Sequence, residues 1–227
     1  RRIVDDAVQR AAGRGDPVPI RESLIRERGS RYIDFLIPGL LGMNLMASSM
    51  WGIGFSVVDQ RRKKLLKRFV ATPMSRAEYL LSFVLARLSL LVIEVGVLVG
   101  LGVLLFEVPL RGSIVTLSAL CLVAAMAFGG LGLLIAARPK TIEAASGLMN
   151  FTMLPMWVFS GVFFSSGNFP DVMQPFIKAL PLTAANDGLR AIMLEGAGFG
   201  ELGLELAILA SWLVVCFAIA LRIFRWK

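Results

Sequence analysis

The chain has 227 residues, of which 56% are hydrophobic, and its mean hydropathy is +0.73. An average soluble domain is about 45–50% apolar, so this composition indicates a membrane protein. The chain contains no His. This excludes the commonest general base and metal ligand, and with it most membrane hydrolases that depend on histidine. Cys121 and Cys216 both fall inside apolar runs, so no disulfide framework is predicted.

Five apolar runs are long enough to cross a hydrocarbon core, which needs about 20 helical residues. Helices satisfy their backbone hydrogen bonds internally, so we predict an all-α, polytopic membrane helical bundle. We expect residues 1–31 to be the end of an external segment and residues 32–227 to be the transmembrane domain. The predicted spans cover residues 33–58, 79–106, 114–137, 144–164 and 204–224.

The net charge of +8 is unevenly distributed. Basic residues gather at 59–78, at Arg138 and Lys140, and at the C-terminus, whereas the alternate loops are poor in them. By the positive-inside rule the basic loops and the C-terminus are cytoplasmic, as in a multi-pass protein of the bacterial inner membrane. A nucleic-acid partner is not needed to explain the charge. This topology places residues 1–31 outside without an export signal, so we expect a further transmembrane helix upstream.

The segment between the first two spans predicts a basic amphipathic helix at the membrane surface, over about 59–76. Its apolar residues gather on one side of a helix, because they follow the spacing i, i+1, i+4 and i+5. They are Leu65, Leu66, Phe69 and Val70. Anchoring to anionic lipid, at about 1 kcal/mol per basic residue, is one interpretation of the charge. A cytoplasmic protein partner is the other.

The end of this segment favours the protein partner, because it has a defined shape. Pro73 biases Thr72 away from the helical region and so ends the basic helix. Ser75 and Glu78 then have the spacing of a capping box, which restarts a helix running into the second span.

Polar residues inside the spans are candidates for the transport path. Arg87 and Glu94 are seven residues apart on one helix face, and ionisable residues are costly in a bilayer. We expect either a structural ion pair, within the chain or across a subunit contact, or a gate. Asn44, Ser48 and Asn150 are candidate path-lining residues, although the small residues of the first span also suit helix packing alone.

Residues 168–195 are too polar to span a membrane and predict short external helices, with re-entrant parts covered by protein. No phosphate-binding loop, metal cluster or nucleophile–base pair is found in the sequence, so an enzyme is not expected. Energy for transport would come from a partner or an ion gradient. An ion-coupled carrier and a non-transporting membrane scaffold are the rival classes.

Four stretches, in this order, resemble the permease subunit of ABC-2-type exporters, the group that includes drug-resistance permeases. In the second, the resemblance rests on Leu66, Thr72-Pro73, Ser75 and Glu78. The sequence departs from that family in having DQRRKKLL where many members have E-x-E-x-G-T. The stretches are YIDFLIPGLLGMNLMASSMWG (32–52), RKKLLKRFVATPMSRAEYLLS (62–82), FSGVFFSSGNFPDVMQPFIKALPLT (159–183) and NDGLRAI (186–192).

The resemblance implies six spans in the complete subunit, pairing of two permeases, and two cytoplasmic ATPase subunits docked on the coupling helices. ATP would be bound and hydrolysed by the partner, and this chain would bind no cofactor. The substrate, whether a drug, a lipid or a lipid-linked glycan, is not specified by the sequence. The residues implied in ATPase coupling are Asp59, Arg62, Leu65, Leu66, Phe69, Thr72 and Pro73.

Overall fold

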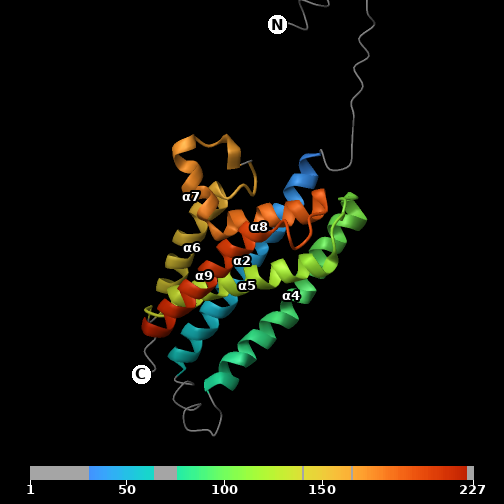
Figure 1. The fold of residues 1–227 in the computed structure, drawn as a ribbon. Coiled ribbons are helices and arrows are strands. Elements are labelled where there is room, and N and C mark those ends of the chain that lie inside the picture. Colours follow the sequence, from blue (N-terminus) through green and yellow to red (C-terminus); the bar gives the residue numbers. More distant parts are fainter. Residues whose placement is uncertain (1–30, 64–75, 140, 165, 224–227) are drawn as a thin grey trace, which may run out of the picture.

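The computed structural model describes residues 31–63, 76–139, 141–164 and 166–223. Every regular element in these ranges is a helix (Figure 1), as predicted. The five long helices are α2 (Tyr32–Arg62), α4 (Arg76–Phe106), α5 (Ile114–Ala136), α6 (Ile142–Phe159) and α9 (Gly203–Ile223). Five short ones lie between α6 and α9: η1 (Ser166–Asn168), η2 (Asp171–Met173), α7 (Gln174–Ala179), α8 (Pro181–Arg190) and the π-helix η3 (Ala191–Glu195).

Four of the long helices contain stretches that are long and apolar enough to cross a membrane: Tyr32–Gln60, Ser89–Phe106, Ile114–Ala136 and Gly203–Ala220. They fall on four of the five predicted spans. The fifth, over 144–164, corresponds to α6, which ends earlier than expected at Phe159. The chain turns there, and Gly161 has a φ of 70°, which favours glycine. That α6 crosses the membrane stays a prediction.

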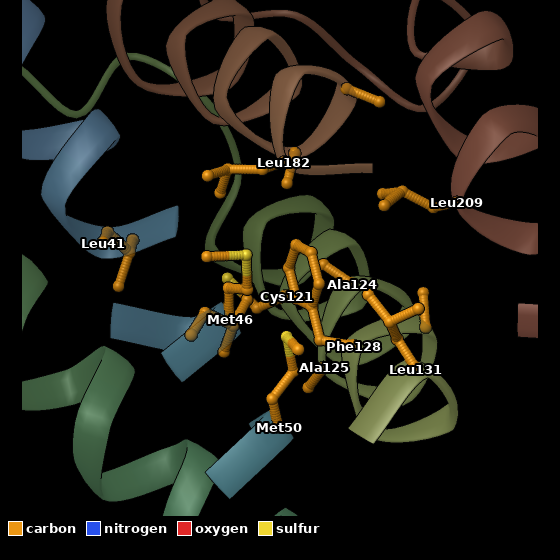
Figure 2. Close-up of a cluster of buried hydrophobic side chains, with 14 of the residues drawn as sticks. Leu41, Met46, Met50, Cys121, Ala124, Ala125, Phe128, Leu131, Leu182 and Leu209 are labelled. Atoms are coloured by element: carbon orange, nitrogen blue, oxygen red, sulfur yellow. The ribbon is translucent and has the colours of Figure 1, made fainter. Parts of the chain in front are cut away.

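Helix α5 lies at the centre of the bundle and packs against both α2 and α9. Its Phe128 is fully buried, and side chains of α2, α8 and α9 surround it (Figure 2). The helices approach closely because α5 carries small residues. A Cβ at Gly132 would lie 2.7 Å from the backbone oxygen of Met50, closer than van der Waals contact allows. The glycines of α5 therefore set the α2–α5 distance.

Helix α4 contributes less to the core and exposes a broad apolar face. Such a face is costly in water and suits lipid chains, so it supports the membrane assignment of the bundle. Its strongly exposed large apolar residues include Leu90, Val92, Ile93, Val97, Leu101, Leu104 and Leu105.

A hydrogen bond from Arg31, which also pairs with Asp34, joins the start of α2 to the end of α4. The guanidinium of Arg31 lies 2.9 Å from Asp34, whose side chain is fully buried, and donates to the carbonyl oxygen of Phe106 at 2.8 Å. Asp34 also accepts the backbone N–H of Arg31, as the third residue of a capped helix does. The hydrogen bond to Asp34 raises the pKa of Arg31. This contact holds the two helix ends together.

The close approach of α2 and α5 predicts different effects for the same substitution at two glycines. Gly132→Ala places a new Cβ against the backbone of Met50, so we expect a loss of about 1–3 kcal/mol in the free energy of unfolding. A Cβ at Gly147 on α6 meets nothing within 4 Å. Gly147→Ala is therefore expected to be neutral or slightly stabilising. Unfolding by SDS in mixed micelles measures both variants, and equal destabilisation would contradict this packing.

Candidate functional site

Helix α8 is a short, polar helix that is buried within the bundle. Nearly all of its residues are buried, and it packs against α2, α5 and α9. Figure 1 shows it crossing the upper part of the bundle, below α7. A helix can enter a membrane in this way only when protein covers it, because its ends and polar side chains need partners. Its burial meets this condition, and that the helix enters the membrane from the outside stays a prediction.

Asn186 anchors the middle of α8. Its side chain is fully buried, and its Nδ2 donates to the backbone oxygen of Ser160, just after α6, at 2.9 Å. A Cβ at Gly42 on α2 would lie 2.1 Å from Asn186 Oδ1, so a larger residue at that position would displace the Asn186 side chain. Asn186 thus joins three segments: α8, the end of α6, and the face of α2 around Gly42.

Arg190 anchors the last turn of α8 to the same two neighbours. Its guanidinium lies over the ring of Phe35, 3.7 Å from the ring centroid, and its Nε donates to the Phe35 backbone oxygen at 3.4 Å. It also donates to the backbone oxygen of Gly161 and lies 3.7 Å from Asp187 of its own helix. A guanidinium can make these contacts together because it is planar. Its N–H donors point outward in fixed directions, and its flat face stacks on the aromatic ring.

Two of the predicted site residues meet near the middle of the bundle. Ser48 Oγ on α2 donates to Glu94 Oε2 on α4 at 2.9 Å. Asn44, four residues before Ser48 on the same side of α2, is half-buried. Asn150 is exposed on α6, a different helix. The side chain of Arg87 is outside the described part of the chain, so its pairing with Glu94 stays a prediction.

The predicted coupling segment is described only at its beginning. Helix α2 continues without a break through Asp59 to Arg62, so these residues extend the first span instead of starting a separate helix. Lys63 Nζ lies 2.7 Å from Asp59. Leu65, Leu66, Phe69, Thr72 and Pro73 lie outside the described residues, and α4 begins at Arg76.

The start of α6 lies close to this end of α2. Thr141 caps α6 by accepting the backbone N–H of Ala144 at 3.2 Å. The pKa of Glu143, in the first turn, is lowered by a backbone hydrogen bond, by Thr141 and by the positive charge of Arg62. The α5–α6 turn and the basic end of α2 thus share one end of the bundle.

Residues 7–222 match the sequence model of the ABC-2 family transporter proteins, which is nearly the whole chain. The chain belongs to the ABC-2 transporter family. Its apolar helices form a polytopic membrane bundle, and the proteins it resembles include ABC-2 permeases.

Three curated relatives illustrate the range of this family. The ABC transporter G family member 20 of Dictyostelium discoideum is 28% identical over 84% of this chain, which spans 26% of that protein. The daunorubicin resistance permease DrrB1 of Streptomyces coeruleorubidus is 25% identical over 86% of this chain and is 70% covered. The linearmycin resistance permease LnrN of Bacillus subtilis is 26% identical over 78% of this chain and is 46% covered.

Asn186 and Arg190 are not among the site residues that the sequence predicts for this ABC-2 chain. The sequence marks their segment only by its family resemblance. One signal is present, because Asn186, Asp187 and Arg190 place three polar groups on one turn of a short helix between apolar segments. Such groups in a membrane domain usually face the protein interior. The backbone oxygens to which Asn186 and Arg190 donate are distant in sequence, and no local pattern reveals them.

The anchoring of α8 predicts a large effect for a conservative substitution. Arg190→Lys keeps the charge but removes the planar guanidinium group that contacts Phe35 and Gly161. We therefore expect a loss of about 1–3 kcal/mol in the free energy of unfolding. Arg138→Lys, the same change at an exposed position, is expected to stay within about 0.5 kcal/mol of the wild type. SDS titration measures both. A similar small change in both variants would show that Arg190 is not an anchor.

Proposed function

We propose that this chain is the permease of an ATP-driven ABC-2 exporter, which forms the translocation path and couples to a separate ATPase subunit. The match of residues 7–222 to the ABC-2 family carries this proposal. Two relatives named as resistance permeases, DrrB1 and LnrN, support export of a small amphiphile. In this proposal two copies of the permease pair in the bacterial inner membrane.

The glycine-rich stretch of α5 does not have the geometry of a phosphate-binding loop. Gly129, Gly130 and Gly132 lie inside α5, where a Cβ on each would meet Ile53, Phe217 and the backbone of Met50, respectively. A phosphate-binding loop instead presents open backbone N–H groups at the start of a helix. These glycines serve helix packing, and ATP belongs to the partner subunit in this proposal.

Helix α2 offers a direct mechanical route from the ATPase to the external half of the path. It is one continuous helix of 31 residues from Tyr32 to Arg62, so it includes the start of the predicted coupling segment at Asp59. Its outer half contacts α8 through Gly42 and Phe35. A displacement of the coupling segment on ATP binding would therefore tilt α2 as a rod and shift the contacts that hold α8.

The coupling proposal predicts which apolar residues hold the ATPase. Changing Leu65, Leu66 and Phe69 together to Asp should abolish co-purification of the ATPase subunit, because the docking face would become charged. A matched control changes Val172 and Phe176 to Asp; both are exposed and lie on η2 and α7, at the opposite end of the bundle (Figure 1). The control should retain the ATPase. Equal retention by both variants would overturn the coupling assignment.

The proposed topology places the basic end of α2 and the C-terminus in the cytoplasm. Lys63→Cys and Arg138→Cys should then react with a membrane-impermeant maleimide only when the cytoplasmic face is accessible, and Lys178→Cys should react from outside. All three positions have exposed side chains, whereas the native Cys121 and Cys216 are buried. Labelling of intact cells and inverted vesicles measures this. The reverse pattern would contradict the topology.

A further inference from the structure

Helix α8 continues directly into the π-helix η3, and its hydrogen-bond pattern changes after Arg190. In a π-helix each N–H donates to the carbonyl five residues back instead of four, so the turn is wider. Such turns are rare, they occur often at functional sites, and helices kink at them. The N–H of Gly196 closes η3 by donating to the oxygen of Ala191. The α8–η3 junction is therefore a place where the direction of the helix can change.

The two parts of this element are attached to different helices. On the α8 side, Asn186 donates to the end of α6, and Trp212 of α9 donates to the backbone oxygen of Ala179, two residues before α8, at 2.8 Å. On the η3 side, the backbone N–H of Arg111, in the loop that follows α4, donates to the oxygen of Met193 at 3.0 Å. A movement of α4 relative to α6 and α9 would therefore act on the junction.

The loop after α4 lies directly against η3 and is joined to the start of α2. A Cβ at Gly112 would lie 2.5 Å from the backbone oxygen of Ile192, so the two backbones are in close contact. Arg31, directly before α2, donates to the oxygen of Phe106 at the end of α4 at 2.8 Å. A displacement of α2 and α4 thus reaches η3 through backbone contacts.

Three buried polar side chains around α8 are not fully paired in the observed arrangement. Ser160 Oγ, Thr183 Oγ1 and Asn186 Oδ1 have no hydrogen-bond partner within the described part of the chain, and their residues are 0–1% exposed. Burying a polar atom without a partner costs free energy. The observed position of α8 therefore carries a cost that a second position can recover in part.

We propose that α8 and η3 form a two-position switch, in which α8 shifts between α2 and α6 and η3 bends to allow the shift. The unpaired polar atoms keep the two positions close in free energy, so that a modest displacement changes their populations. ATP binding by the partner subunit moves α2 and α4, and the loop after α4 transmits this movement to η3. The ATP-driven step rests on the proposed function, whereas the existence of two positions does not.

A fixed supporting helix would explain fewer of these features. Such a helix can keep the α-helical pattern to its end, and protein interiors rarely leave buried polar side chains unpaired. A switch uses the wide turn of η3, its attachment to the loop after α4, and the incomplete pairing of α8 together.

One substitution of equal shape tests the two positions without nucleotide. Thr183→Val replaces the unpaired hydroxyl by a methyl group, which removes the cost of burying it and so favours the observed position. Hydrogen exchange of residues 190–197 should slow about fivefold, the effect of one unpaired group on an opening equilibrium. Resistance to SDS unfolding should stay equal or rise. The sample is the permease purified with its ATPase partner in nanodiscs, and mass spectrometry measures the exchange.

Thr152→Val is the matched control. It is the same substitution on α6, but Thr152 Oγ1 donates to the oxygen of Leu148 in its own helix at 2.9 Å. Its removal should leave the exchange of residues 190–197 within about twofold of the wild type, because a hydroxyl bonded within its own helix contributes little.

Nucleotide should act in the opposite direction to Thr183→Val. Trapping the wild-type complex with ATP and vanadate should raise the exchange of residues 107–113 and 190–197 several-fold, because the Arg111–Met193 hydrogen bond and the η3 turn open. Residues 117–131 of α5, at the centre of the bundle, should stay protected.

Unchanged or faster exchange in Thr183→Val, or a loss of its stability, would overturn the switch, since the hydroxyl would then be satisfied, for example by bound water. So would an equal response in Thr152→Val, or trapping that leaves residues 190–197 unchanged in a complex that couples ATP hydrolysis to transport. If the wild type does not couple the two, the proposed function fails, and the Thr183→Val result alone decides whether α8 has two positions.

Discussion

A short polar helix buried among apolar helices must find its hydrogen-bond partners in the protein, and this requirement shapes the half of the bundle that contains α8. In α8, Asn186 and Arg190 donate to backbone oxygens at the end of α6 and on α2. Because Gly42 has no side chain, α2 can pack closely against Asn186 of α8. Because α8 depends on both neighbours, it cannot move without changing its contacts to α2.

This dependence gives the proposed transport cycle a physical basis. Helix α2 is continuous from the basic coupling segment to the contacts with α8, and α5 holds it at a distance set by Gly132. A packed interface of this kind changes between discrete arrangements instead of deforming smoothly. The Ser48–Glu94 hydrogen bond lies between the two ends of α2, so a tilt of that helix against α4 would change the geometry of this bond.

The sequence predicts the long helices well, because hydrophobic length and helix-stop signals are local properties. The predicted spans 33–58, 79–106, 114–137 and 204–224 differ from α2, α4, α5 and α9 by only a few residues at each end. The predicted end of α6 is too late, since the apolar run continues through Val162 to Phe164 although the chain turns at Gly161. A hydropathy profile does not reveal a turn that is made of apolar residues.

The candidate site is predicted less well, because its contacts join residues far apart in the sequence. Ser48 and Glu94 are each recognisable as intramembrane polar residues, but their hydrogen bond depends on how α2 and α4 pack. In the sequence Arg190 is only a charge in a loop poor in basic residues, whereas in the structure it lies against Phe35 from the start of α2. The role of a polar residue in a short helix depends on its tertiary partners, and composition and periodicity do not reveal these partners.

The central claim is that ATP hydrolysis by a separate subunit drives transport through this chain. The most direct measurement is uptake of fluorescent amphiphiles into proteoliposomes that contain the permease and its ATPase partner, with the nucleotide-binding face outward. We predict uptake that requires both proteins and hydrolysable ATP and that persists when ion gradients are dissipated. Uptake by the permease alone, driven by an imposed ion gradient and indifferent to ATP, would contradict the account and identify an ion-coupled carrier.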